Sequence, residues 1–272
     1  MSKNLLITGL PRSGTSLITS LLATNLSAVA FSEPLWMKQV RDQSPDADAF
    51  QRQLQQQIDD LRRDIQSGQP VPIKQSRFKS GVPDNYYHRS QDGQIIVDKQ
   101  EVFEHLPKHL ADATFIIKAN AQFTACLAAL LRNPNNQIIA VVRNPVSVLM
   151  SWRSLDIPVS HGKMLVAEKY HPEFASDTQA DDLLGRQILI LDWFFKQYAR
   201  HQDRITLVRY ESLISDPQAV LRGITGQSSH QLPALRSKNK NQAYDQSELA
   251  VLQQRLQAIG QHHQAVYPTA AA

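Results

Sequence analysis

Residues 5–18 constrain the fold of this chain more than any other stretch, because they contain a strand, a loop and a helix in immediate succession. The apolar run Leu5–Ile7 predicts a buried strand, and a turn containing Gly9 and Gly14 follows it. Apolar residues then recur at helical spacing up to Leu22. In such a strand–loop–helix unit, the backbone N–H groups of the loop and the positive end of the helix dipole favour negative charge at one place. The stretch therefore predicts a site for an anion, most simply a phosphate-like group.

The two glycines have the spacing of a P-loop, G-x-x-x-x-G-K-[ST], but the lysine of that motif is absent. Thr15 stands in the lysine position, Ser16 follows it, and a cation, Arg12, lies inside the loop instead. In a nucleoside triphosphatase this lysine reaches the β- and γ-phosphates, so its absence argues against that chemistry. For this stretch taken alone, an ordinary strand-to-helix turn is the alternative interpretation.

The composition agrees with an anionic ligand and excludes several classes of protein. Of the 272 residues, 42% are hydrophobic and 20% are charged, which is typical of a globular protein with a substantial core. The net charge of +4 suits a small anion and is too weak to predict nucleic acid as a partner. The one cysteine, Cys126, permits neither a disulfide framework nor a cysteine metal cluster, and its apolar surroundings predict a core position.

Targeting and membrane patterns are absent from the sequence. The chain enters its first strand at once, without the pattern of a signal peptide, and it contains no apolar run of about 18 residues. We therefore expect a cytoplasmic protein without stable membrane insertion, with one domain over residues 1–272. A module cut from a larger chain would have the same appearance.

Short β-branched runs alternate with helical patterns along the chain. This alternation predicts an α/β fold with a doubly wound, mainly parallel sheet and helices on both faces, like the nucleotide-binding fold of P-loop proteins. Residues 68–93 lack periodicity and are interpreted as a mobile loop that contacts a substrate, and residues 269–272 as a frayed tail. The expected strands are 5–7, 28–31, 94–97, 114–117, 137–142 and 206–208, and the main expected helices are 14–24, 46–67, 102–110, 123–131, 181–201 and 247–259, with 160–171 irregular.

Four charged residues follow predicted strands: Arg12, Glu33, Lys118 and Arg143. Ligands of doubly wound sheets bind at the carboxyl ends of the strands, so we expect these four groups to converge. Glu33 has three interpretations that the sequence leaves open: a ribose ligand of a dinucleotide fold, a general base, or a surface residue before a proline turn. For Lys118 the alternative is a solvated lysine at a strand end.

A second anion station is predicted at Arg143 and Ser151. Arg143 ends a strand, and Ser151 lies eight residues further on, in the helix that Asn144 and Pro145 open. One charged donor and one hydroxyl suit a second phosphate. A P-loop nucleotidase would place a magnesium-binding Asp at a strand end, whereas this strand ends in Arg.

Three sequence blocks together resemble one family. Residues 11–16, Pro-Arg-Ser-Gly-Thr-Ser, resemble the 5′-phosphosulfate loop of sulfotransferases that use 3′-phosphoadenosine 5′-phosphosulfate (PAPS). Residues 142–152 are similar to their 3′-phosphate motif, with the usual Arg-to-Ser spacing, and residues 208–217 to a third family block. The three blocks come in the family's order and span roughly residues 4 to 217.

The resemblance implies a role for each matching residue. Arg12 and the loop residues Ser13, Gly14, Thr15 and Ser16 would hold the 5′-phosphosulfate, Arg143 and Ser151 the 3′-phosphate, and Tyr210 would contact the nucleotide. The pattern is closest to the bacterial and tyrosylprotein branches, in which a Glu is the proposed base and a Lys ends the strand before the 3′-phosphate block. Glu33 and Lys118 match these two positions.

The sequence departs from another branch of the family in two respects. The cytosolic phenol and steroid branch uses a catalytic His, but neither His105 nor His109 lies in that motif, so Glu33 is the preferred base. That branch also ends with an Arg-Lys-Gly nucleotide block, which this chain lacks. The basic loop 236–240, with Lys238 and Lys240, is the expected substitute.

The resemblance implies sulfuryl transfer in line from PAPS to a hydroxyl or amine, without a metal. Glu33 would take the acceptor proton, and Lys118 and Arg12 would stabilise the developing charge. The acceptor is a small molecule, glycan, lipid or peptide, and the sequence specifies neither its identity nor the oligomeric state. The alternatives are a kinase-like or nucleotidase enzyme, which would turn over ATP with magnesium, and a non-catalytic nucleotide-binding module, which would not require Glu33 and Lys118.

Overall fold

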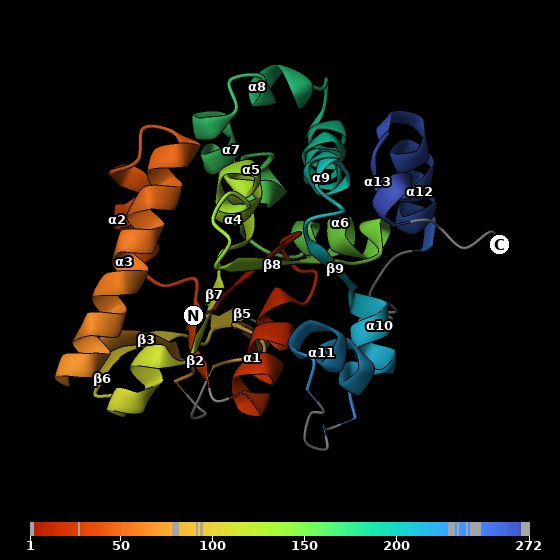
Figure 1. Ribbon diagram of the computed structural model, residues 1–272. Coiled ribbons are helices and arrows are strands. Elements are labelled where there is room, and N and C mark those ends of the chain that lie inside the picture. Colours follow the sequence, from red (N-terminus) through yellow and green to blue (C-terminus); the bar gives the residue numbers. More distant parts are fainter. Residues whose placement is uncertain are drawn as a thin grey trace. The chain divides into compact units, whose positions relative to one another are not determined.

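The structure of this protein is a computed structural model. It describes residues 3–26, 28–77, 82–90, 92, 95–227, 232, 234–237, 239 and 246–267. Nine strands are assigned in these residues (Figure 1). They are β1 Asn4–Gly9, β2 Ala28–Ser32, β3 Val71–Gln75, β4 Tyr87–Arg89, β5 Ile95–Val97, β6 Gln100–Glu104, β7 Thr114–Lys118, β8 Asn136–Val142 and β9 Thr206–Arg209.

The helices alternate with these strands through most of the described chain. The α-helices are α1 Thr15–Asn25, α2 Trp36–Asp42, α3 Ala47–Ser67, α4 Asn120–Ala125, α5 Leu127–Leu130, α6 Pro145–Arg153, α7 Leu165–Tyr170, α8 Phe174–Asp177, α9 Leu183–Arg200, α10 Tyr210–Ser215, α11 Pro217–Thr225, α12 Gln246–Ile259 and α13 His263–Val266. Two 3₁₀ helices, Lys108–Asp112 and Pro158–His161, complete the described elements.

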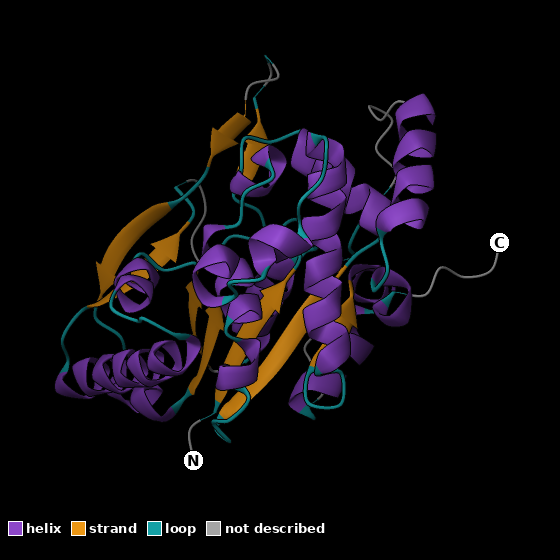
Figure 2. Ribbon diagram, turned by 90° about the horizontal axis from the view of Figure 1, so that it is seen from above, coloured by secondary structure: helices purple, strands orange, loops and turns teal. Residues whose placement is uncertain are grey.

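Five of the strands form one sheet in the order β2-β7-β1-β8-β9. Strand β7 pairs in parallel with both β1 and β2, and β8 pairs in parallel with β9. Ile7 of β1 and Ser32 of β2 are both in register with Lys118 of β7. Strands β1, β2, β7 and β8 are largely apolar and buried, which is the pattern of a parallel sheet covered by helices, whereas only Val208 of β9 is buried. The α/β fold with a mainly parallel sheet is therefore confirmed (Figure 2).

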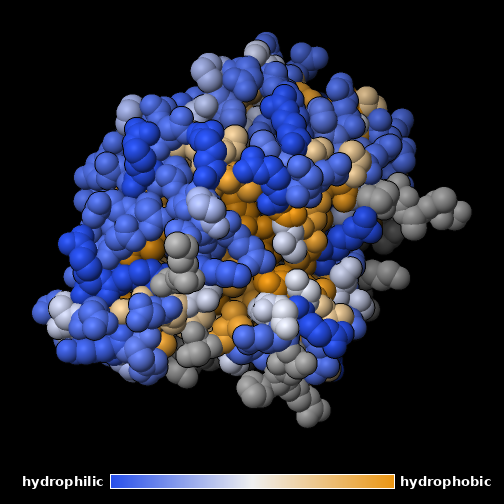
Figure 3. Space-filling view, in the orientation of Figure 1, coloured by the Kyte–Doolittle hydropathy of each residue, from blue (hydrophilic) through white to orange (hydrophobic). Residues whose placement is uncertain are grey.

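The chain divides into two compact units, which are described separately. The first unit contains residues 1–7, 15–119 and 128–138, and its longest helix is α3. The Asp46 side chain accepts a hydrogen bond from Ala49 N at the start of α3, and Gly68 ends this helix with φ +77°. One stripe of α3 is buried, as its spacing predicts: Phe50, Leu54, Ile58, Leu61 and Ile65. The outward face of α3 is correspondingly hydrophilic, as Figure 3 shows.

The second unit contains residues 8–14, 120–127 and 139–272, and α9 forms the centre of its core. The buried face of α9 is rich in aromatic residues, and the helix contacts α6, α12 and α13. Asp192 of α9 accepts hydrogen bonds from the backbone N–H groups of His262 and His263, at 2.7 and 3.1 Å, and one from His262 Nδ1 at 2.7 Å. This buried carboxylate fixes the start of α13 against α9.

Two expectations from the sequence are wrong. The described part of residues 68–93 is not irregular, because β3 pairs with β6 and β4 pairs with β5. The helix expected at 102–110 is replaced by the end of β6 and the 3₁₀ helix Lys108–Asp112, since Val102 pairs with Ile73 and Pro107 lacks the N–H group that a helix interior needs. The substrate role of 68–93 stays a prediction, and the expected tail at 269–272 lies outside the described residues.

Two further segments also differ from the expectation. Residues 160–171 contain α7, and the helix expected at 123–131 is divided into α4 and α5. Cys126 lies between α4 and α5 and is 1% exposed, in agreement with the expected core position. Burial raises the pKa of the Cys126 thiol to about 12. In the described part of the chain, no helix has the length and apolar character needed to cross a membrane.

Candidate active site

The loop between β1 and α1 has an unusual backbone conformation. Arg12 has φ +73° and Gly14 has φ +97°, both in the region that L-amino acids rarely adopt. Two side chains hold the loop in this conformation: Ser13 Oγ donates to Val141 O at 2.8 Å, and Trp152 Nε1 donates to Pro11 O at 2.8 Å. The loop is therefore fixed to β8 and α6 in the second unit.

Arg12 and Arg143 connect the first and the second predicted anion station. Arg12 Nε donates to Ser151 Oγ at 3.3 Å, and Arg143 Nη1 donates to Arg12 O at 3.0 Å. Residues separated by more than 130 positions in the sequence thus share hydrogen bonds. Arg143 and Ser151 are 6% and 7% exposed, so their donors lie in a largely desolvated place. There, charged hydrogen bonds to a phosphate are strong.

A small polar network orients the Arg143 guanidinium. Arg143 Nε donates to Asn239 Oδ1 at 2.6 Å, and Asn239 Nδ2 donates to Glu211 Oε1 at 2.6 Å. The same Glu211 oxygen accepts from Asn144 N at 3.1 Å. The sequence places Glu211 in the third block and Asn239 in the basic loop, but neither position alone indicates a partner for Arg143. Only the folded chain shows that the two residues act on this arginine.

Tyr210 packs between Arg143 and the loop. The Arg143 Cζ atom lies 4.6 Å from the centre of the Tyr210 ring, in a cation–π arrangement. A Cβ atom on Gly14 would lie 2.8 Å from Tyr210 Cδ2, closer than real contacts allow. Gly14 is therefore required by its positive φ and by the ring of Tyr210.

The start of α1 fits an anion. The helix begins at Thr15, directly after Gly14, and its first turn contains no acidic residue. The first N–H groups of a helix have no partner within it, so those at Thr15 and Ser16 are suited to a phosphate-like ligand. Backbone N–H groups at a helix start are donors of the kind that the predicted first anion station needs.

A carboxylate and a lysine form a separate pair in the first unit. Glu33 directly follows β2, Lys118 ends β7, and the Lys118 Nζ atom lies 2.7 Å from Glu33 Oε1. Glu33 N also donates to Lys118 O at 2.8 Å. Lys118 is 3% exposed, whereas nearly half of the Glu33 side chain, 46%, is exposed. A buried cation thus holds a carboxylate that solvent and a ligand can reach.

The charge state of Glu33 is set by the lysines around it. Loss of water favours the neutral carboxyl and acts to raise its pKa, but Lys118, with Lys74 and Lys99, outweighs this effect and lowers the pKa of Glu33. Glu33 is therefore a carboxylate at neutral pH, the form in which it accepts a proton. The same shift makes it a weaker base than an isolated glutamate.

The comparisons with known proteins agree with the sequence blocks. The profile described as the sulfotransferase family matches residues 4–233. The chain belongs to the sulfotransferase family. The β1–α1 loop, the Glu33–Lys118 pair and Tyr210 lie within the matched residues. Of the Arg143 network, Asn144 and Glu211 also lie within them, and Asn239 lies just beyond.

Several solved bacterial sulfotransferases are similar to this sulfotransferase at low sequence identity. They are STF1 from Mycobacterium tuberculosis (13% identity, 95% of this chain and 77% of that chain, TM-score 0.45), STF9 from Mycobacterium avium (15%, 99% and 69%, 0.40) and the sulfotransferase domain of the Synechococcus olefin synthase (14%, 100% and 90%, 0.41). No curated protein matches the chain.

The remaining candidates from the sequence have different outcomes. Lys238 and Lys240 lie outside the described residues of this sulfotransferase, so their expected donor role stays a prediction. His105 shares a hydrogen bond of 2.9 Å between Nδ1 and the carbonyl of Gly68, and His109 lies in the 3₁₀ helix Lys108–Asp112. No bond connects either histidine to Glu33 or Lys118 among the described residues.

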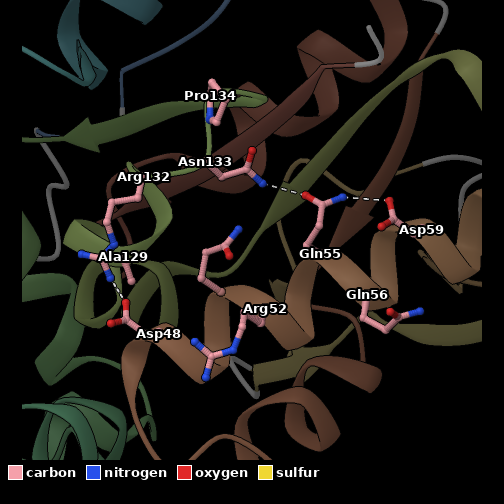
Figure 4. Close-up of a pocket in the computed structure, with 10 residues that line it drawn as sticks. Asp48, Arg52, Gln55, Gln56, Asp59, Ala129, Arg132, Asn133 and Pro134 are labelled. Carbon is pink, nitrogen blue, oxygen red and sulfur yellow. Dashed lines mark hydrogen bonds and ion pairs between the residues drawn. The ribbon is translucent and has the colours of Figure 1, made fainter.

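A shallow pocket of about 610 Å³ in the first unit is separate from all these residues. It lies between α3 and the segment 129–134, and its polar side chains bind one another: Asn133 with Gln55, Gln55 with Asp59, and Arg132 with Asp48 (Figure 4). None of the predicted site residues lines it. We therefore base the candidate site on the motif residues and assign no ligand to this pocket.

Proposed function

We propose that this sulfotransferase transfers a sulfuryl group from PAPS to a hydroxyl or amine of an acceptor. One observation carries the proposal: hydrogen bonds join Arg12 of the first block to Ser151 and Arg143 of the second block. The donor of the reaction has two anionic ends, a 5′-phosphosulfate and a 3′-phosphate. Two basic stations held together in one unit are the arrangement that such a donor needs.

In this proposal the second unit supplies most of the donor contacts. Arg143 and Ser151 bind the 3′-phosphate, while Arg12 and the amides of residues 13–16 bind the 5′ end. Tyr210 supports Arg143 and Gly14, and contributes an aromatic surface for the nucleotide. PAPS supplies the sulfuryl group when bound, and the family relation is the reason for choosing it among bisphosphate nucleotides.

Glu33 and Lys118 are the proposed reactive pair. Glu33 Oε1 accepts the bond from Lys118, and its ionised carboxylate takes the proton of the acceptor hydroxyl. Lys118 and Arg12 stabilise negative charge that develops as the sulfuryl group leaves the donor. Positioning and charge stabilisation account for most of such a reaction, because the protein forms no covalent bond with the group transferred.

Binding of the product 3′-phosphoadenosine 5′-phosphate (PAP) tests the donor stations. Arg12→Ala and Arg143→Ala should each weaken calorimetric affinity at least tenfold, since each removes a charged hydrogen bond of roughly 1.5–3 kcal/mol. Arg132→Ala is the matched control. Arg132 is exposed and pairs with Asp48 of α3, so this variant should leave the affinity for PAP unchanged. Unchanged affinity in both site variants would contradict the donor assignment.

The proposed base is tested by Glu33→Gln, which removes the charge and preserves the shape. Turnover should fall by roughly 10²–10⁴-fold, the usual contribution of general base catalysis, while affinity for PAP stays the same. Steady-state rates and calorimetry on the same variant separate the two effects. A fully active Glu33→Gln variant would exclude Glu33 as the base.

Radiolabelled PAPS, incubated with a panel of peptides, sugars, lipids and phenols, tests the enzymatic activity itself. Label transfer to an acceptor is the expected outcome. Magnesium-dependent turnover of ATP without sulfuryl transfer would favour the kinase-like alternative. Binding of PAP without transfer to any acceptor would favour a non-catalytic nucleotide-binding module.

A further inference from the structure

We propose that Lys74 and Tyr86 are positioning residues, which hold the turn at Glu33 so that its carboxylate stays oriented for reaction. This inference rests on the proposed role of Glu33 as the base. All of the groups involved lie in the first unit.

The turn at Glu33 has a conformation that needs external support. Glu33 has φ +47°, in the left-handed region that a residue with a Cβ atom adopts only at a cost. Such conformations persist where surrounding contacts over-determine them. On one side, Lys118 satisfies both the amide and the carboxylate of Glu33. The backbone carbonyl groups of Ser32 and Glu33 in this turn also need hydrogen-bond donors.

Lys74 of β3 supplies the first of these partners. Its Nζ atom donates to the backbone carbonyl of Glu33, and the residue is only 6% exposed. Burial, the largest effect on this ammonium, lowers the pKa of Lys74. A methionine would fill the same space without this desolvation cost. The ammonium is therefore explained by its bond to the turn and not by packing.

Tyr86 supplies the second partner. Its hydroxyl donates to Ser32 O at 3.3 Å, one peptide before Glu33, and its ring lies 6.0 Å from Lys74 Nζ and 5.6 Å from Lys118 Nζ. The tyrosine is 5% exposed, so the ring and both ammonium groups form one packed cluster. The two lysines that contact the turn thus both lie near the same aromatic ring.

Asp98 connects β3 to Tyr86. Its carboxylate, 3% exposed, accepts hydrogen bonds from Ser76 Oγ and from Arg77 N, directly after β3, and its own N–H donates to Tyr86 O at 2.8 Å. Asp98 therefore connects the end of β3 with Tyr86, so the two proposed supports of the Glu33 turn share one buried carboxylate residue. The described part of 68–93 supports the proposed base through backbone contacts.

Several charged groups surround Glu33 and affect the pKa of its carboxyl. Lys118 of β7, Lys74 of β3 and Lys99 before β6 all lower the pKa of its carboxyl, and Glu101 of β6 interacts with Lys74. Lys99 is exposed and makes no hydrogen bond to the Glu33 turn among the described residues. Lys99→Met therefore removes a nearby charge without removing a support, and is the matched control for Lys74→Met.

Steady-state kinetics of sulfuryl transfer from PAPS, with the best acceptor of the panel, form the first measurement. Lys74→Met should lower kcat roughly 10- to 100-fold, the loss expected when a reacting group is displaced by about 1 Å, with the KM for PAPS within about twofold. Lys99→Met should keep kcat within about twofold. Both variants should move the acidic limb of the pH–rate profile to higher pH, because each removes a cation that lowers the pKa of Glu33. Tyr86→Phe should lower kcat without moving the limb.

Amide hydrogen exchange at Glu33 is the second measurement and needs no acceptor. The bond from Glu33 N to Lys118 O should lose protection by about tenfold or more in Lys74→Met and Tyr86→Phe, relative to Lys99→Met. Unchanged protection in both variants, or equal loss of kcat in Lys74→Met and Lys99→Met, would overturn the inference. If no acceptor is sulfated, the proposed function fails, while the exchange data still decide whether Lys74 and Tyr86 hold the turn.

Discussion

At the scale of single residues, backbone conformation and proposed function coincide. In the part of the chain that the structure describes, Arg12 and Glu33 are the only residues other than glycine with positive φ. Each such conformation costs about 1–2 kcal/mol, and such strain is found preferentially at functional sites. Arg12 follows β1 and Glu33 follows β2, so both occur where a strand of the main sheet ends. Backbone geometry therefore singles out Arg12 of the first sequence block and Glu33, the base that the sequence favours.

Gly14 gives a prediction at this scale. Gly14→Ala should destabilise the protein by about 1–3 kcal/mol and weaken PAP binding, because φ is +97° and the new Cβ atom would meet the Tyr210 ring at 2.8 Å. Gly223 of α11 is the matched control, since nothing lies within 4 Å of a Cβ atom there. Gly223→Ala should be neutral or stabilise by up to about 1 kcal/mol. Urea unfolding and calorimetry measure both effects, and equal stability of the two variants would contradict the account of Gly14.

At the scale of elements, helix α13 is held by one buried carboxylate. Burial acts to raise the pKa of Asp192, but hydrogen bonds from His263 and His262 outweigh it and lower this pKa to about 2. The ionised form of Asp192 is thus favoured in the folded protein. This sets the sign of its pH dependence: the stabilisation is complete above the ordinary carboxyl pKa of 3.8 and is lost as pH falls toward 2.

Asp192→Asn should therefore lower the free energy of unfolding by about 2 kcal/mol at pH 6, with a smaller difference from the natural protein near pH 3. Asp177→Asn is the control, because Asp177 pairs with Lys196 of the same helix α9 but is partly exposed, and should cost less than about 1 kcal/mol. Urea unfolding at the two pH values provides the measurement. A loss at pH 6 no greater than that of Asp177→Asn would show that Asp192 does not hold α13.

Elements with local signals were predictable from the sequence, and those that depend on distant pairing were not. The helix expected over 46–67 from its apolar spacing is confirmed as α3, Ala47–Ser67, and the structure adds local signals at its ends, a cap at Asp46 and a left-handed Gly68. Strand β3 contains Pro72 and only five residues, so no periodicity identified it. Its partner β6 begins 25 positions after β3 ends. Val102 of β6 fits a helical pattern equally well in the sequence, and only its pairing with Ile73 identifies it as part of a strand.

The same distinction applies to the candidate site. Arg12, Glu33, Lys118 and Arg143 follow or end strands with clear apolar patterns, so their positions were predictable. The supporting contacts of Lys74, Tyr86 and Asn239 were not, because each depends on where a distant segment packs. In the sequence, Lys74 and Tyr86 lie in the aperiodic segment 68–93, and Asn239 lies in the basic loop 236–240. A residue that supports another through one hydrogen bond leaves no pattern in a single sequence.

At the scale of the whole molecule, ligand binding and stability are linked. PAP at a concentration 100 times its Kd should raise the free energy of unfolding by about 2.7 kcal/mol, because it binds the folded chain alone. Thermal unfolding with and without PAP should show this as a higher Tm. Arg143→Ala should cut this gain to about 1.4 kcal/mol or less at the same PAP concentration, the value for at least tenfold weaker binding, whereas Glu33→Gln should retain it in full. An undiminished shift in Arg143→Ala would place the anion elsewhere on the protein.

The buried position of Cys126 has a practical consequence for spectroscopy. The chain contains one cysteine, its thiol is 1% exposed, and its raised pKa leaves almost no reactive thiolate at neutral pH. Maleimide reagents should therefore leave the natural protein unlabelled. A single new cysteine, such as Val251→Cys on the exposed side of α12, would then carry a fluorophore or spin label alone. Whether donor binding changes the surroundings of α12 can then be measured without first removing the native thiol.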